Sequence, residues 1–140
     1  MSELYCSEVA YAMPQKDCDR LFAAAAAYAE EHPECRTEPL GNPIELLVQA
    51  VRRDFRVRSL GENWSVLYWA WFEGWTRARK DVAFVSEFAD ALDRVQFLRV
   101  GEQLDDTECR DDAPVRLIGV HAAIGVDDSD ADPIPESDGC

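Results

Sequence analysis

The sequence predicts a single α+β domain, with a mainly antiparallel sheet of about four strands and two to three helices packed on one face. Three observations lead to this fold class. The length of 140 residues is that of one domain. Hydrophobic residues make up 47% of the chain, which is enough to form a core. The apolar pattern also switches between the strand and the helix period, in the order strand, helix, helix, strand, helix, strand, strand.

The first two elements follow from a change of period near Pro14. Residues 4–13 alternate between the two faces of an extended chain and run into this proline, which predicts a strand. The apolar spacing then changes to three and four residues around an alanine run, so a helix is expected over residues 15–31. It has to end before Pro33, because a residue that precedes proline disfavours the helical conformation.

A second helix is expected from Asn42 onward. The asparagine can cap the helix, Pro43 suits its first turn, and Glu45 stands three residues after the cap. The expected buried stripe consists of Ile44, Leu47, Val48, Val51 and Phe55. Four arginines would then stand near the C-terminus of the helix, where cations are favourable, with a basic surface patch as the alternative: Arg52, Arg53, Arg56 and Arg58.

The most apolar stretch of the chain, residues 64–75, is predicted to be a strand that is covered on both sides. One face would carry Trp64, Val66, Tyr68, Ala70 and Phe72, and the other Leu67, Trp69 and Trp71. The tryptophans could stack on a ligand or pack in the sheet. If Trp69 and Trp71 are exposed, a protein interface is the expected use, because aromatic side chains are enriched there.

A third helix, capped by Asp81, and two closing strands over residues 95–100 and 115–126 complete the expected domain. The domain is therefore placed at residues 1–126. Residues 127–140 are acidic and contain proline, serine and glycine, so we expect a disordered tail.

The charge is strongly acidic and unevenly distributed. Twenty-eight acidic residues against 14 basic ones give a net charge of −14. Residues 1–100 hold 16 acids and 12 bases (−4), whereas residues 101–140 hold 12 acids and 2 bases (−10). Such a field repels nucleic acid and anionic membranes and attracts basic surfaces. Adaptation to a saline environment would be an alternative cause of acidity, but it would spread the acids over the whole surface.

Motifs for familiar chemistry are missing from the sequence. No glycine-rich phosphate loop or nucleophile motif occurs, and the two histidines have no partner at a zinc spacing, so no catalytic residue, metal site or cofactor is expected. An apolar run of transmembrane length and a signal peptide are absent too, so we expect a cytoplasmic protein. The five cysteines are then expected to be reduced thiols.

At the level of a class, and without a specific motif, the chain resembles small acidic inhibitors made by phages and mobile elements, the anti-CRISPR and anti-restriction proteins, several of which imitate DNA. Acidic residues on the segment 101–112 and in the tail carry this likeness: Glu102, Asp105, Asp106, Glu108, Asp111, Asp112, Asp127, Asp128, Asp130 and Asp132. The resemblance implies a protein without catalytic activity that inhibits a basic nucleic-acid-processing partner.

The expected partner-binding residues are the six acids of segment 101–112 together with Trp69 and Trp71 as aromatic anchors. The partner would be a basic nucleic-acid-binding protein or a nuclease complex, with no direct contact to nucleic acid or membrane. An immunity protein for a nuclease toxin and a small enzyme of unrecognised type are the alternatives. The sequence leaves the oligomeric state open, a homodimer included.

Overall fold

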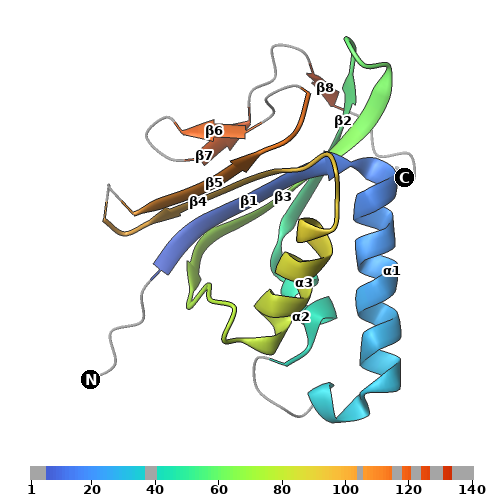
Figure 1. The fold of residues 1–140 in the computed structure, drawn as a ribbon, viewed down its shortest axis with the longest axis vertical. Helices are drawn as coiled ribbons and strands as arrows, with labels where there is room; N and C mark the ends of the chain where they lie inside the picture. Colours follow the sequence, from blue (N-terminus) through green and yellow to red (C-terminus); the bar gives the residue numbers. More distant parts are fainter. Residues whose placement is uncertain are drawn as a thin grey trace.

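The computed structural model describes residues 6–36, 41–103, 106–114, 118–120, 124–126 and 131–133. Its helices are α1 (Gln15–Glu31), α2 (Pro43–Gln49) and α3 (Lys80–Asp90), with a short 3₁₀ turn over Pro33–Arg36. Its strands are β1 (Cys6–Pro14), β2 (Val51–Val57), β3 (Glu62–Glu73), β4 (Gln96–Gly101), β5 (Thr107–Asp111), β6 (Ile118–Val120), β7 (Ile124–Val126) and β8 (Ala131–Pro133). The α+β class predicted from the sequence is confirmed (Figure 1).

The main sheet has the order β5-β4-β1-β3-β2-β8, and every neighbouring pair is antiparallel. Its centre, β4-β1-β3-β2 with a helix after β1 and another after β3, is the split βαβ arrangement of the ferredoxin-like topology. The prediction of about four strands matches this centre. The described residues extend it to six, because β5 adds to the β4 edge and β8 to the β2 edge.

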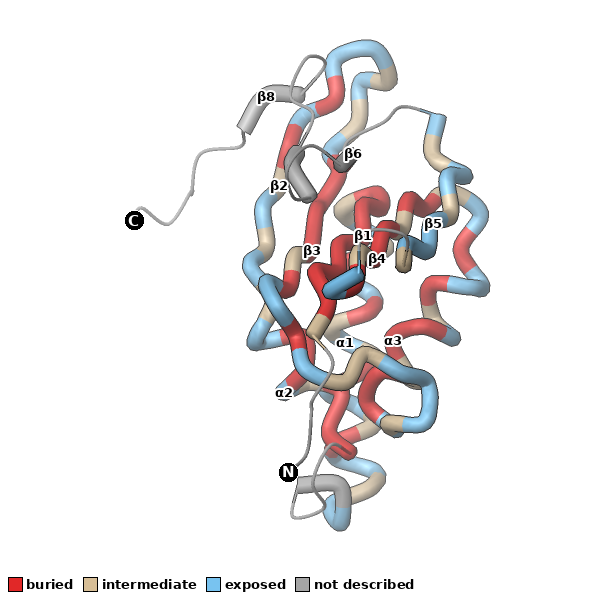
Figure 2. Tube along the Cα trace, turned by 90° about the vertical axis from the view of Figure 1, so that its left-hand side faces the viewer, coloured by how far each residue is buried: buried red, intermediate tan, exposed pale blue. Residues whose placement is uncertain are grey.

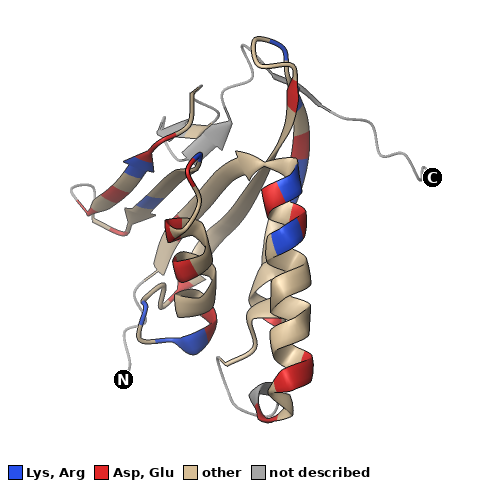
Figure 3. Cartoon of the chain, turned by 45° about the vertical axis from the view of Figure 1, so that its right-hand side comes forward, with Lys and Arg blue, Asp and Glu red and all other residues tan. Residues whose placement is uncertain are grey.

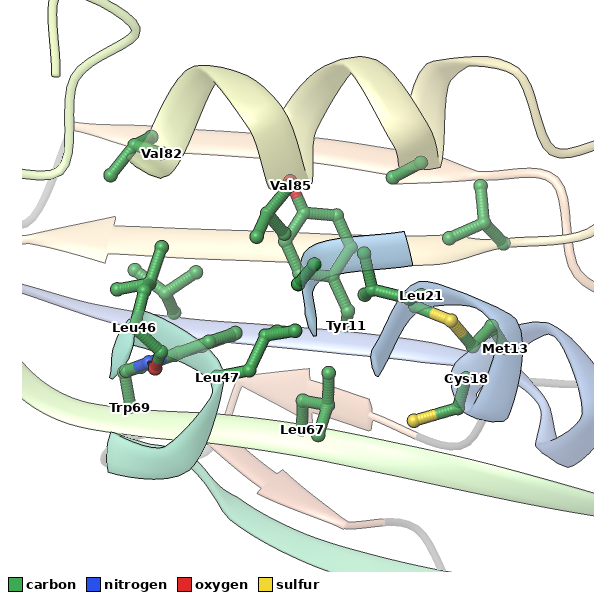
Figure 4. Packing of buried hydrophobic residues seen from close by; sticks show 14 of the residues in the cluster. Tyr11, Met13, Cys18, Leu21, Leu46, Leu47, Leu67, Trp69, Val82 and Val85 are labelled. Atoms are coloured by element: carbon green, nitrogen blue, oxygen red, sulfur yellow. Dashed lines mark hydrogen bonds between the residues drawn. The ribbon is translucent and has the colours of Figure 1, made fainter. Parts of the chain in front are cut away.

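Each face of the sheet carries a core of its own, and β1 is buried on both faces (Figure 2). All three helices pack on one face, as predicted, and form the helix-side core with side chains that include Tyr11, Leu21, Leu46, Leu67 and Val85 (Figure 4). The hairpin-side core, on the opposite face, includes Ala10, Phe55, Trp64 and Val66 and is completed by Ile118 of β6.

The second predicted helix is wrong beyond its first two turns. Asn42 does cap α2, since its Oδ1 accepts a hydrogen bond from the Ile44 amide at 3.1 Å. The chain then turns extended at Ala50, and the four arginines thought to end a helix lie on β2 or just after it. The segment forms a strand because it pairs with β3, which buries Phe55 and leaves Val51 exposed. Val48, another member of the predicted stripe, is exposed on α2.

The strand predicted over residues 64–75 is confirmed as β3, but it contains a bulge. Beyond the bulge, side chains lie on the opposite face from the one that strict alternation predicts. The register against β1 shifts between the pairs Val9↔Trp69 and Ser7↔Phe72, which leaves one extra residue in β3. The extra residue reverses the alternation, so Phe72 joins Trp69 in the helix-side core rather than lying opposite it. Trp71 lies in the bulge with a φ of 48°, a conformation that side chains larger than glycine rarely adopt.

The helix expected after residue 80 and the strand expected over 95–100 are confirmed as α3 and β4. Asp81 is not the cap that was predicted. Arg79 holds that position, and Asp81 lies inside the first turn, where it accepts from the Val82 amide at 2.8 Å and pairs with Arg79.

The last predicted strand, residues 115–126, is represented by two short strands, β6 and β7, which pair as a hairpin. Of the predicted tail, residues 127–130 and 134–140 lie outside the described residues, whereas Ala131–Pro133 pair with β2 as β8. Within the described part of the chain, no helix has the length and apolarity that crossing a bilayer requires.

Candidate functional site

The acidic segment 101–112, for which no strand was predicted, is largely the second half of a hairpin, in which β5 pairs with β4 along five residues. The turn is closed by backbone hydrogen bonds from Gly101 N–H to the Asp106 carbonyl at 2.8 Å and from Asp106 N–H to the Gln103 carbonyl at 2.9 Å. Because β5 is the outermost strand on this side, its side chains are mostly exposed. In Figure 3, where the ribbon is coloured by residue type, a basic position lies between acidic positions on this strand.

Arg99 organises the acids at the turn end of the hairpin. Its side chain lies on the helix-side face of β4 and is only 8% exposed. The guanidinium donates to Asp106 at 2.7 Å, to Glu108 at 2.9 Å and to the Ser7 hydroxyl of β1 at 2.9 Å. Hydrogen bonds with Asp106, and then with Glu108, raise the pKa of Arg99 above its usual value. Two carboxylates are therefore held side by side by one cation that is anchored in the sheet.

Arg110 connects the other end of the hairpin to α3. Its guanidinium donates to the backbone carbonyls of Ala89 at 2.9 Å and Leu92 at 2.7 Å, at the C-terminal end of that helix. A cation suits this position, because the last carbonyls of a helix lack intrahelical partners. The same side chain pairs with Asp112 at 2.5 Å. The position of the hairpin is thus fixed relative to the helix layer.

The remaining predicted acids lie on the same edge. The carboxylate of Glu102 accepts a hydrogen bond from the backbone N–H of Cys6 at 2.6 Å, and Asp111 is exposed at the end of β5. Asp105 lies outside the described residues. The structure therefore brings five of the six predicted acids together on one edge of the sheet, and three of them, Asp106, Glu108 and Asp112, pair there with Arg99 or Arg110.

A cleft of about 580 Å³ lies between this hairpin and α3. It exists because the sheet is wider than the helix layer, so the helix-side face of β4 and β5 extends beyond α3 (Figure 1). Three aromatic side chains, Tyr11, Trp75 and Phe97, contribute to its lining. Tyr11 stacks on Phe97 with the ring centroids 4.7 Å apart, and burial raises the pKa of Tyr11 to about 12, so its hydroxyl stays protonated.

The walls of the cleft carry charged side chains. Asp90 of α3 pairs with Arg77 at 2.8 Å, and Glu108 of β5 faces the cleft together with Arg99. The side chains of Asp90 and Glu108 are 51% and 61% exposed, so solvent still reaches both carboxylates. The cleft thus combines an aromatic lining with carboxylates on its opposite walls.

The two predicted tryptophan anchors differ in exposure. Trp69 is buried in the helix-side core, where its indole N–H donates to the carbonyl of Leu46 at 2.9 Å, so it is not a surface anchor as predicted. Trp71 is 58% exposed, on the bulge of β3. The bulge explains the difference, since it separates the two side chains that strict alternation would place on one face.

Sequence reasoning missed the two arginines that organise the acids and the aromatic residues of the cleft. In the sequence, Arg99 is a single charged residue within an apolar strand. The signal that could have indicated its role is that it shares a strand face with apolar residues, where an unpaired charge is unfavourable. Ser7, its partner in β1, is 92 residues away along the chain. No local pattern indicates such a pairing.

Side chains that could act as metal ligands are spread out among the residues whose placement is described. Within that part of the chain, no three histidine, cysteine or acidic side chains gather as metal ligands would. Cys6, Cys18 and Cys109 form no disulfide there, and burial raises the pKa of Cys18 to about 11.

Comparison of the chain with protein-family models, with curated proteins and with solved structures finds no match.

Proposed function

We propose that this chain is an interaction protein that binds and inhibits a basic nucleic-acid-processing protein, as anti-CRISPR and anti-restriction proteins do, and that the β4–β5 hairpin is its contact surface. The observation that carries the proposal is the placement of the acids. Glu102, Asp106, Glu108, Asp111 and Asp112 share one exposed edge of the sheet. A surface that binds nucleic acid presents cations at regular intervals, and carboxylates along an edge complement them.

The rigidity of the hairpin favours this use of its charge. Arg99 and Arg110 fix the hairpin to β1 and to α3 through hydrogen bonds to Ser7 and to two carbonyls of the helix end. Side chains that are already ordered lose less conformational entropy when a partner binds. The two arginines also reduce the charge of the hairpin, so each acid is expected to contribute only modestly to affinity and to act on the rate and selectivity of association as well.

An exposed aromatic side chain is the second element of the proposal. Trp71 is held away from the core by a backbone conformation that is unfavourable for tryptophan. Backbone strain of this kind is concentrated at functional sites, and tryptophan is enriched among the residues that dominate binding energy. Trp71 is therefore proposed as the apolar anchor, and Trp69 is not.

The test compares two triple variants with the same net charge. Glu102→Gln/Asp111→Asn/Asp112→Asn removes three charges from the hairpin, and Glu30→Gln/Glu31→Gln/Glu45→Gln removes three exposed charges from α1 and α2. Each immobilised chain is exposed to a bacterial lysate that contains CRISPR effectors and restriction nucleases. Retained proteins are identified by mass spectrometry at low and at high salt, with and without competing duplex DNA.

We expect the wild type to retain a nucleic-acid-binding protein that duplex DNA displaces. The hairpin variant should retain about tenfold less, if each exposed charge contributes about 0.5 kcal/mol. The α1/α2 variant should behave as the wild type does. Equal losses in both variants would mean that only the net charge matters, and an effect in neither would exclude the hairpin as the contact surface. Undiminished nuclease activity of the retained protein at saturation would refute inhibition.

A further inference from the structure

We infer that the cleft between α3 and the β4–β5 hairpin binds an arginine side chain of a partner protein, with the guanidinium over the aromatic lining and between the carboxylates of Asp90 and Glu108. This inference rests on the proposed function, since it names the side chain with which the basic partner would engage the hairpin. It depends on the aromatic lining of the cleft and on the two carboxylates of its walls.

The aromatic lining provides a surface on which a flat cation can stack. Phe97 and Trp75 are partly exposed and pack against the buried ring of Tyr11, with centroid distances of 4.7 Å and 6.3 Å, so these two rings are the ones that a cation would contact. Aromatic faces attract cations, and the planar guanidinium stacks on them better than an ammonium group does. The same chain already uses this contact, since Arg79 lies over the ring of Phe72 at 4.6 Å.

The carboxylates on the two walls are available because their present partners can release them at small cost. Asp90 is paired with Arg77 at 2.8 Å, in a pair whose side chains are both more than half exposed, and with Arg110 at 3.9 Å, close to the outer limit of an ion pair. Pairs of these two kinds contribute little. Glu108 shares Arg99 with Asp106, so Arg99 keeps a charged partner when Glu108 turns toward a ligand. An incoming guanidinium would therefore replace weak pairings rather than break a buried network.

A cationic occupant fits this cleft better than an anionic one. The arginines on its hairpin side, Arg99 and Arg110, already donate to Ser7, to Asp106 and to carbonyls at the end of α3. The net charge of −14 also repels anions at long range. A cleft of about 580 Å³ is larger than one side chain needs, so it can also hold neighbouring residues of the partner's segment.

The test uses two blocked tripeptides as probes: acetyl-Leu-Arg-Leu-amide, and the same peptide with citrulline, a neutral isostere, in place of arginine. Each is titrated into the full chain labelled with ¹⁵N, and the resonances of the Trp75 indole N–H and of the Phe97 and Glu108 amides are followed. Asp90→Asn/Glu108→Gln removes the two carboxylate charges but keeps oxygen acceptors. Glu30→Gln/Glu45→Gln removes two exposed charges elsewhere and is the matched control.

We expect saturable shifts at the cleft with the arginine peptide, about tenfold weaker binding of the citrulline peptide, and about tenfold weaker binding of the arginine peptide to Asp90→Asn/Glu108→Gln. The matched control should bind as the wild type does. Equal binding of the two peptides, or shifts spread over all acidic surfaces, would overturn the inference.

The two proposals can fail separately. If the peptide does not bind in the cleft but the hairpin triple variant still loses its partner, the cleft inference is wrong and the proposed function stands. If the peptide binds in the cleft but partner capture ignores both salt and hairpin charge, the proposed function is wrong. The cleft would then remain an arginine-binding site without that role.

Discussion

Replacing Gln96 by leucine removes the two hydrogen bonds that hold β6 against the main sheet. The side-chain amide of Gln96 donates to the carbonyl of Ile118 at 2.8 Å, and its oxygen accepts from the Ile118 amide at 3.2 Å. Both residues are buried. Each backbone group left without a partner costs about 1–3 kcal/mol, so two of them would cost about 2–6 kcal/mol. Alternatively, β6 can detach, so that water pairs with these groups. Detachment would expose the side chain of Ile118, and the lost burial costs about 1.5–3 kcal/mol.

We therefore expect Gln96→Leu to lower the free energy of unfolding by about 2–4 kcal/mol. This is the lower part of the range for two unpaired backbone groups, because detachment of β6 would let water pair with them. Urea unfolding measures the loss, and hydrogen exchange at the Ile118 amide shows whether β6 opens locally. A loss below about 0.5 kcal/mol, the range of an ordinary surface substitution, together with unchanged exchange, would refute the role given to Gln96.

Gln96→Glu separates hydrogen bonding from shape, because glutamate can donate to the Ile118 carbonyl only when it is protonated. Burial would raise the folded-state pKa of this carboxyl above its unfolded value of about 4.3. A raised acid pKa makes the folded state comparatively stable at low pH and less stable as the pH rises through it. The variant should thus approach wild-type stability in acid and fall below it at neutral pH. A difference from wild type that does not change with pH would contradict this mechanism.

Three further predictions concern single side chains. Trp69→Phe should destabilise the fold by about 1–3 kcal/mol in urea unfolding, because it leaves a carbonyl of α2 unpaired, whereas Trp71→Phe should stay within about 0.5 kcal/mol; equal losses would contradict the assigned burial. Burial, then a hydrogen bond with a carboxylate, raises the pKa of Tyr68 from 10.0 to about 12, so stability should fall as the pH rises from about 10 through about 12. The variant Tyr68→Phe should show a smaller fall in stability over this pH range. If its pH profile is the same as that of the wild type, the fall does not come from Tyr68. Iodoacetamide should label the exposed Cys109 well before the buried Cys18, whose pKa of about 11 keeps it protonated, as peptide mass spectrometry can follow; equal rates would show that the helix-side core opens readily.

The first elements of the chain could be predicted because their local signals agree with the fold. Pro14 separates an alternating segment from one with helical spacing, and the structure has β1 on one side of that change and α1 on the other. The segment after residue 50 was ambiguous. Val51 and Phe55 fit a helical stripe, while Phe55 and Val57 fit a strand, and only pairing with β3 selects the strand.

The hairpin and the cleft could be predicted only in part. The acids of β5 obscured its strand character, because an edge strand with exposed side chains shows no apolar period. Their common location was nevertheless indicated by the uneven charge. The cleft depends on Tyr11 of β1, Phe97 of β4 and Trp75 of the connection between β3 and α3, and no spacing in the sequence brings these rings together.

The central position of β1 has a consequence for the folding of the nascent chain. β1 is synthesised before both of its partner strands: Cys6 pairs with Glu73 and Ser7 pairs with Gly101, which follow 67 and 94 residues later. Until β4 has left the ribosome, β1, an apolar strand that is buried in the finished fold, has at least one unpaired edge. Contacts so distant along the chain slow folding, and an unpaired strand edge favours aggregation. The chain should therefore be most prone to aggregation while it is still being translated, before residue 101 has emerged.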